Sequence, residues 1–275
     1  MSDWTGVLEL DTQKSQSGKT ITKNLFFQGA FKVMRPVYHN GSNQPCYYLL
    51  NPGGGYLDGD TYRMRVTVGE QAMVTLTTQS ATKVYRTPNK HAYQEAEIVL
   101  QGGSHLQYLP DPLIAYKGAS YYQKTVFRLD KGASLLYTDI LTPGWSPDGE
   151  AFSYDSLRLK TEVFLENELI VFDHIHLNPD GKSMDRIGLM EGYTHLGSFL
   201  IVGEQSDAEL EEKLFEVING QCGDFKAGIS QLTKAGLSIR VMANKTQVIE
   251  NIFKDCHHLV NKEWFGTEPS PLRKY

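Results

Sequence analysis

Residues 61–78 read TYRMRVTVGEQAMVTLTT, two runs of strand-forming residues separated by a Gly-Glu turn. In the first run Tyr62, Met64, Val66 and Val68 alternate with polar or small residues. Successive side chains of a β-strand point to opposite faces, so a period of two places one set inward and the other outward. Enrichment in Val, Thr and Tyr also favours strands. This segment therefore predicts two β-strands with a turn between them.

The same pattern continues towards the C-terminus. Turns that contain glycine, such as Gly102-Gly103 and Asp130-Lys131-Gly132, follow one another at intervals of roughly ten residues, which is typical of an extensive β architecture. We recognise no sequence repeat and no low-complexity linker. The first two-thirds of the chain is therefore expected to be mainly β. Further strands are expected at 97–100, 121–129, 134–140, 157–165 and 169–177.

The last third changes character. Ser206 with Glu209 forms a possible capping box for a helix that ends near Gly220. A second helix is expected over 246–264, and a strand pair over 228–242 lies between the two helices. The simplest organisation is a single domain over residues 1–275. It would be mainly β over 1–205 and would carry the helices and the strand pair over 206–265, with a tail over 266–275.

Composition narrows the classes of function. The chain has 275 residues and a net charge of −5, which argues against a non-specific nucleic-acid binder, because such a protein needs a surplus of Lys and Arg. Cys46, Cys222 and Cys256 form no C-x-x-C pair, and an odd number does not suggest a disulfide framework. We see no signal peptide and no run of about 20 apolar residues. A cytoplasmic protein that does not enter a membrane is expected.

Several catalytic motifs are missing. Gly18-Lys19-Thr20 ends like a phosphate-binding loop, but Gln13 stands where that loop needs its first glycine. The chain has no G-x-S-x-G nucleophile elbow and no H-E-x-x-H zinc helix. Pro52-Gly53-Gly54-Gly55 has no βαβ context and is read as a tight turn that needs positive φ. Nucleotide hydrolysis by this chain is therefore not expected.

Two histidines leave a metal site open. His174 and His176 lie two positions apart on an expected strand, so both imidazoles could meet one metal ion, as in cupins. The glutamate that cupins place a few residues later is missing, and a pair on a strand face is the alternative. Cys256, His257 and His258 could not all bind one ion from a helix, because adjacent residues point roughly 100° apart.

The polar segment 77–83, TTQSATK, is unusual for a strand end. It could line a polar channel or an interface, and a solvated strand edge is the alternative. Asp60, Asp111, Asp139 and Glu150 each lie beside Gly, Pro or apolar residues. Carboxylates in such settings are hard oxygen ligands for a passing divalent cation, although aspartate is also favoured in turns.

These segments together resemble one family. The chain is similar to the urease accessory proteins called UreD (UreH in some organisms) from about Phe27 to Leu177, and more loosely in its C-terminal third. Trp145 departs from the pattern, because many members carry Arg there, and any role of that Arg is unassigned here. The resemblance rests on residues 51–55, 59–60, 77–86, 109–112, 139–140, 149–152 and 156–158.

The resemblance implies a mainly β fold of stacked strands, similar to a β-helix or a β-sandwich. It also implies a protein that is not an enzyme. It implies a maturation factor, or chaperone, that assembles with a helical UreF-type protein and a UreG-type GTPase on apo-urease. There it would help to insert nickel, with Ni²⁺ in transit through an internal passage and no permanently bound cofactor. A conduit must release its ion, and isolated carboxylates suit release better than a closed Cys/His cage.

On this basis two groups of residues are candidates. Those for a transient nickel path are Asp60, Asp111, Asp139, Glu150 and Glu162. Those for a polar channel or interface are Thr78, Gln79, Ser80, Thr82 and Lys83. Two other functions stay open: a metal-dependent, cupin-like β enzyme that uses His174 and His176, and a purely structural binding module. The enzyme would hold a stoichiometric ion, and the binding module would tolerate loss of its buried carboxylates.

Overall fold

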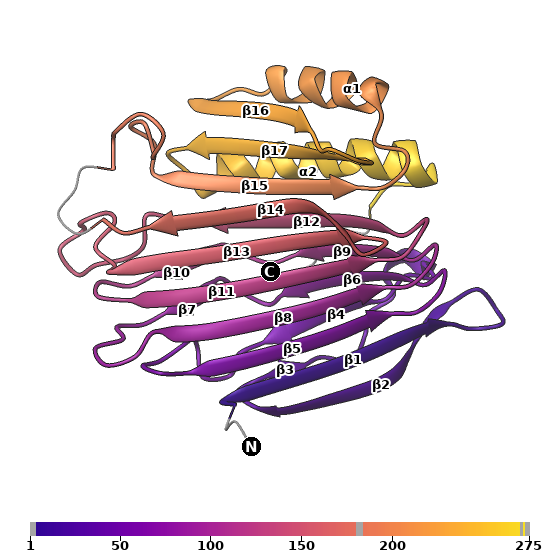
Figure 1. Ribbon diagram of the computed structural model, residues 1–275, viewed down its shortest axis with the longest axis horizontal. Coiled ribbons are helices and arrows are strands. Elements are labelled where there is room, and N and C mark those ends of the chain that lie inside the picture. The colour runs from indigo at the N-terminus through magenta and orange to yellow at the C-terminus, as the bar shows by residue number, and fades with distance from the viewer. Residues whose placement is uncertain (1–3, 180–183, 270–271, 273–275) are drawn as a thin grey trace.

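Two β-sheets packed face to face make up most of the protein. We describe residues 4–179, 184–269 and 272 of a computed structural model. Figure 1 shows one sheet in front of the other, with both helices at the end of the stack that carries β15 and β17. The mainly β fold with two C-terminal helices confirms the fold expected from the sequence.

Sheet A has the order β14-β13-β11-β8-β5-β1-β2, and sheet B follows the path β16-β17-β15-β12-β9-β6-β4-β3. Two short strands, β7 (Thr82–Val84) and β10 (Leu113–Ala115), pair with each other. In chain order the strands of sheet A are β1 (Gly6–Lys14), β2 (Thr20–Gly29), β5 (Thr61–Val68), β8 (Ala92–Leu100), β11 (Ser120–Leu129), β13 (Ser156–Leu165) and β14 (Glu168–Leu177). Those of sheet B are β3 (Lys32–Val33), β4 (Cys46–Leu50), β6 (Met73–Thr78), β9 (His105–Leu109), β12 (Ser134–Leu141), β15 (His195–Val202), β16 (Phe225–Gln231) and β17 (Gly236–Ala243).

The middle of the chain winds as a solenoid. Each turn runs along sheet A, crosses to sheet B, and returns beside the strand that it made one turn earlier. Thr61 pairs with Tyr93, and Ala92 pairs with Tyr121, both in parallel. A turn thus takes roughly thirty residues, the scale of solenoid repeats. No repeat was recognised in the sequence, because the turns share backbone pairing and differ in side chains.

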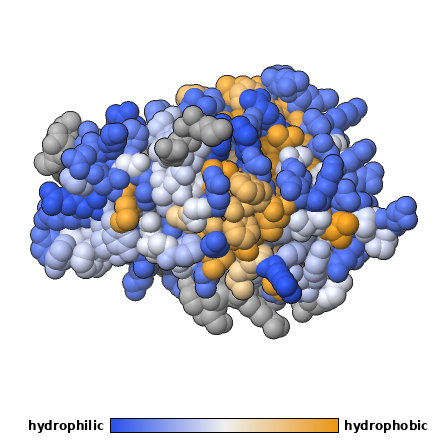
Figure 2. Space-filling model, turned by 90° about the horizontal axis from the view of Figure 1, so that it is seen from below, coloured by the Kyte–Doolittle hydropathy of each residue, from blue (hydrophilic) through white to orange (hydrophobic). Residues whose placement is uncertain are grey.

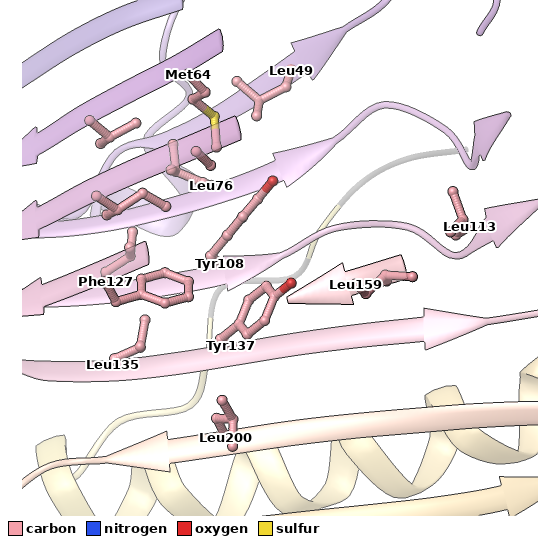
Figure 3. Packing of buried hydrophobic residues seen from close by; sticks show 14 of the residues in the cluster. Leu49, Met64, Leu76, Tyr108, Leu113, Phe127, Leu135, Tyr137, Leu159 and Leu200 are labelled. Carbon is pink, nitrogen blue, oxygen red and sulfur yellow. The ribbon is translucent and has the colours of Figure 1, made fainter. Parts of the chain in front are cut away.

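The core lies between the sheets. The alternation predicted for residues 62–68 is confirmed, because Tyr62, Met64, Val66 and Val68 are all buried there. Figure 3 shows part of this packing, in which Leu135 and Tyr137 of β12 face Phe127 of sheet A. Inward residues from every turn thus form one continuous hydrophobic cluster.

A second core forms where helix α1 (Ala208–Asn219) and helix α2 (Thr246–Phe265) cover the outer face of sheet B. Gly197 of β15 lets α2 approach closely, since a Cβ there would lie 2.4 Å from Cγ2 of Ile249. The predicted Ser206 cap is wrong: Asp207 is the N-cap residue of α1, and its carboxylate accepts a hydrogen bond from the Leu210 N–H. Aspartate fits this position as well as serine does, and sequence alone does not fix the register.

The opposite end of the stack carries β1, β2 and β3. Seen from that side, hydrophobic residues form a band between polar areas of the surface (Figure 2). Phe26 in β2 and Met34 just after β3 are nearly half exposed. Solenoids usually end in polar caps, so an apolar end is typical of a surface that contacts another protein. Across the described residues, neither helix has the length and apolarity needed to cross a membrane.

Candidate functional site

A cavity of about 90 Å³ lies between the two sheets, and its lining reaches the surface at the exposed residues Gln79 and Ser80. Its walls include Tyr108 and Tyr137 from sheet B and Gln94 and Gln123 from sheet A. A water molecule occupies about 30 Å³ in the liquid, so the cavity has room for a few waters or a partly hydrated cation. Burial of polar groups between two sheets costs free energy unless a partner satisfies their hydrogen bonds, so polar residues at this position need a physical reason.

Tyrosines supply much of the polarity of the cavity. The rings of Tyr108 and Tyr137 stack with their centroids 5.5 Å apart, and their hydroxyls point to the same side (Figure 3). Burial raises the pKa of both hydroxyls far above the ordinary value, with the charge of Asp139 as a further cause. They therefore stay neutral and act as hydrogen-bond donors or acceptors. The Tyr56 hydroxyl donates to Oε1 of Gln94 across the cavity.

Asp139 is the acidic centre of the cavity. Its Oδ2 accepts hydrogen bonds from the Tyr137 hydroxyl at 3.0 Å and from Nε2 of Gln123 at 3.3 Å. Burial nevertheless raises the pKa of the Asp139 carboxyl to about 6, because it outweighs the lowering effect of these two hydrogen bonds. A carboxylate in this position lacks a full counter-charge. A cation that enters the cavity can supply this charge and displace the proton.

The polar segment of the sequence lies at the same cavity. Thr78, Gln79, Ser80, Thr82 and Lys83 all line it, in the connection where β6 ends and β7 begins. The Gln79 N–H donates to the carbonyl of Leu49 at 3.0 Å, and the Thr82 N–H donates to the carbonyl of Pro112 at 3.0 Å. The segment is thus fixed to the solenoid turns on both sides of it.

Asp111 joins the cavity through Thr78. The Thr78 hydroxyl donates to the Asp111 carboxylate and accepts from the Asp111 N–H, each at 2.8 Å. Gly55 lines the wall as well, and a Cβ there would lie 2.6 Å from the Lys83 carbonyl oxygen, so only glycine fits. Gly54 has a φ of 79°, which confirms the tight turn predicted for this segment.

The other three candidate carboxylates do not line this cavity. Asp60 caps its own turn by accepting from the Leu57 N–H at 2.8 Å. The Glu150 side chain is 65% exposed and lies 3.6 Å from Nζ of Lys117. Glu162 belongs to the outward-facing set of β13 and pairs with Lys160 at 3.0 Å. The structure therefore brings Asp111 and Asp139 together with the polar segment and leaves Asp60, Glu150 and Glu162 apart.

His174 and His176 lie on the outer face of β14. Their rings are stacked with centroids 6.4 Å apart, and Nε2 of His176 accepts a hydrogen bond from Nε of Arg158 at 3.2 Å. Within the described ranges, no three His, Cys, Asp or Glu side chains gather closely enough to hold a metal ion. Trp145, the departure from the family pattern, is half exposed and packs on Tyr116 at 4.9 Å between centroids.

Sequence reasoning did not single out Tyr108, Tyr137, Gln94 or Gln123. One signal was available: in the strand expected over 134–140, residues 137 and 139 share a face, so Tyr137 had to accompany Asp139. The two glutamines come from other strands, and their approach depends on how the turns of the solenoid stack.

Comparison with known proteins adds to this geometry. The family described as "UreD urease accessory protein" matches residues 5–274. A protein of Lachnoclostridium phytofermentans named "Urease accessory protein UreD" is 46% identical over 275 residues, which is the whole of both chains. Proteins of the same name from Staphylococcus aureus strains JH9 and Newman are 42% identical, over 99% of this chain and 98% of theirs. A match along nearly the whole length leaves no part of the fold outside the comparison, and the chain belongs to the UreD family of urease accessory proteins.

Proposed function

We propose that this protein is a maturation factor of urease that passes Ni²⁺ through its interior cavity to the apo-enzyme. It would work in the cytoplasm as a chaperone, in a complex with a UreF-type protein and a UreG-type GTPase, with the ion in transit and no resident cofactor. The observation that carries the proposal is the cavity between the sheets in which Asp111 and Asp139 meet the polar segment Thr78–Lys83. The family membership supports the link to urease.

The cavity suits transit better than storage. Carboxylate, hydroxyl and amide oxygens bind a divalent cation less tightly than a set of thiolates and imidazoles does. Lys83 is among the residues that line the cavity, and its positive charge would oppose tight binding of a cation. Asp139 can exchange a proton for the ion, which favours entry without a deep energy minimum. A passage that binds weakly at several points lets an ion both enter and leave.

The apolar end of the stack, at β2 and β3, supports work in a complex. Exposed apolar residues there, such as Phe26 and Met34, would be covered by a partner protein. The cavity provides the route for the ion, and this surface provides an attachment site separate from the cavity.

The test is nickel loading of urease in cells that lack this protein and receive variants of it together with urease and the other accessory proteins. Asp111→Asn and Asp139→Asn keep the size of the side chains and remove the charges. We expect several-fold lower nickel per urease for each variant and a larger loss for the double variant. Matched controls are Glu150→Gln and Glu162→Gln, which remove carboxylates outside the cavity.

Co-purification with the partners must accompany the measurement of nickel. A double variant that assembles normally and yields fully loaded urease would eliminate the cavity as the route. A purely structural binding module predicts that outcome.

A further inference from the structure

The two sheets do not end together. Sheet A stops at β14, whereas sheet B continues past β12 through β15, β17 and β16. The inner face of β15 therefore lies at a seam against the last strand of sheet A, and the inner face of β17 lies beyond it (Figure 1). This seam is one boundary between the interior of the stack and its surface.

Apolar residues line most of this seam, and a single row of polar residues crosses it. On β15 the inward residues Leu196 and Leu200 pack against the main core, and Ser198 stands between them. On β14 the residues Ile175 and Val171 pack against the same core, and Asp173 stands between them. Two facing strands thus interrupt their apolar faces with a polar residue.

The row begins at the cavity and ends in solvent. Asp139 of β12 pairs with Ser198 of β15, and Ser198 pairs with Arg240 of β17, so the three share one face of sheet B. Asp139 lines the cavity, Ser198 is buried, and the side chain of Arg240 is 36% exposed. A continuous polar line therefore leads from the cavity to the surface through an otherwise apolar seam.

An ion pair lies at the surface end of this polar row. Nη2 of Arg240 lies 2.5 Å from the Asp173 carboxylate, and Nη1 donates to the Ser198 hydroxyl at 2.6 Å. Both charges affect the Asp139 carboxyl group: Asp173 raises its pKa and Arg240 lowers it. Because a guanidinium stays protonated at all ordinary pH values, Arg240 repels a cation for as long as it stays in the seam.

We propose that the Asp173–Arg240 ion pair is the closed gate of an opening between the interior cavity and the surface, at the seam of β14 and β15. A divalent cation that leaves or enters here replaces Arg240 as the counter-charge of Asp173 and Asp139, and the long Arg240 side chain swings into solvent. Two carboxylates and the Ser198 hydroxyl are oxygen ligands of the kind that such a cation accepts. In its assignment of the cation, this inference rests on the proposed function.

Access to the cavity can be measured without urease. Gln123→Cys places a thiol in the cavity wall, and Cys222→Ser removes the exposed native cysteine, while Cys46 and Cys256 are buried. The probe is the small cation 2-aminoethyl methanethiosulfonate, and the readout is its rate of reaction with the cavity thiol. Because Gln123 is partly exposed and the cavity reaches the surface at Gln79 and Ser80, Thr125→Cys, at a buried inward position of the neighbouring row, is the second reporter, which separates opening of the gate from that access.

In this background Arg240→Met and Asp173→Asn should raise the reaction rate at least tenfold. The matched control is Arg63 with Glu95, an ion pair at 2.7 Å with similar exposure on the outer face of sheet A. Arg63→Met and Glu95→Gln should leave the rate unchanged. Exchange of the two gate charges, Asp173→Arg with Arg240→Asp, should restore slow reaction.

Two results would overturn the gate: an unchanged rate in the Arg240 and Asp173 variants, or an equal rise in the control variants. The outcome is separate from that of the proposed function. If Asp139→Asn blocks nickel loading while the thiol assay shows no change, the route stands and the gate fails. If the thiol assay shows opening while Asp111→Asn with Asp139→Asn loads urease fully, the gate controls access to the cavity and the nickel route fails.

Discussion

The hydroxyl of Thr78 accepts a hydrogen bond from the backbone N–H of Asp111 and donates one to its carboxylate, both at 2.8 Å. One side chain thus fixes both the backbone and the carboxylate of a residue that lies 33 positions later. Because Thr78 ends β6 and Asp111 follows β9, this contact joins two successive turns of the solenoid at the wall of the cavity.

Replacement of Thr78 by Val keeps the shape of the side chain and removes both hydrogen bonds. We expect the free energy of unfolding to fall by about 1–3 kcal/mol, since a buried hydrogen bond contributes about 1 kcal/mol and loss of its partner adds a desolvation cost. Thr78→Ser keeps the hydroxyl and should lose less than Val. Urea denaturation measures both. A larger loss for Ser than for Val would assign the effect to packing of the methyl group, which Val keeps and Ser lacks.

Asp139→Asn should stabilise the protein above pH 6. Burial raises the pKa of Asp139 to about 6, from an ordinary value of about 4. The folded state therefore holds the proton more tightly than the unfolded state, so this group's contribution to stability is complete below pH 4 and is lost as the pH rises through 6. At pH 7.5 the variant should exceed the wild type by on the order of 2 kcal/mol, and at pH 4 the gap should close.

Denaturation in urea at both pH values measures this gap. A gap that does not depend on pH would contradict a raised pKa. The variant is also expected to load less nickel into urease, so greater stability with lower activity would separate a functional loss from misfolding.

Acid should weaken the contact between α2 and β9. Burial lowers the pKa of His105 to about 3, with His257 as a second cause, and burial lowers the pKa of His257 to about 3, with His258 as a second cause. An unfolded histidine has a pKa of about 6.5, so between pH 6.5 and 3 the unfolded chain binds protons that the folded chain does not. Stability should fall through this window by up to about 1.4 kcal/mol per pH unit for each histidine.

His105→Gln should reduce the slope of stability against pH between 6.5 and 4.5, as measured by urea denaturation. The matched control is His91→Gln, at an exposed histidine of a loop, which should keep the wild-type slope. The comparison uses slopes because loss of the hydrogen bond between His105 and Ser134 lowers the stability of the variant at every pH. Identical slopes in all three proteins would contradict the lowered pKa of His105.

Gly197→Ala tests the close packing of α2 against sheet B. The added Cβ would lie 2.4 Å from Cγ2 of Ile249 and 2.8 Å from the Phe253 ring. Overpacking in a filled core costs about 1–3 kcal/mol, and thermal unfolding should show that loss. Ile249→Ala removes Cγ2 and makes room, so the double variant should lose less than the sum of the two single losses. If the double variant shows the sum of the two single losses, the contact is not the cause.

Local pattern was enough to predict the strands and not enough to predict how they stack. The alternation at Tyr62 and Met64 fixes which side chains face inward, and the polar composition of residues 77–83 marks a special segment. By contrast, the contact of Thr78 with Asp111 depends on parallel pairing between successive turns. Backbone hydrogen bonds carry that pairing and leave no repeat in the sequence.

The same limit explains the spread of the candidate carboxylates. Asp139 and Glu162 both lie on strands, and each strand face is visible from the pattern, but the sequence does not show which carboxylate faces a cavity. Glu162 faces outward beside Lys160. The gate was also not predicted, since Asp173 and Arg240 lie on different sheets and meet only because sheet A ends at β14 while sheet B continues to β17.

His174→Ala with His176→Ala decides between a conduit and a metal-dependent enzyme built on this pair. The lone pair of His176 Nε2 already accepts a hydrogen bond from Arg158, so a metal ion would have to displace a fixed positive charge before it could bind there. We therefore expect equilibrium dialysis with Ni²⁺ or Zn²⁺ to give the same affinity for the wild type and the double variant, and urease loading to stay unchanged. One tightly held ion per chain that disappears in the double variant would favour the enzyme instead. The nickel-loading test would then have to be repeated with that ion removed, because a resident metal and a transit route make opposite demands on affinity.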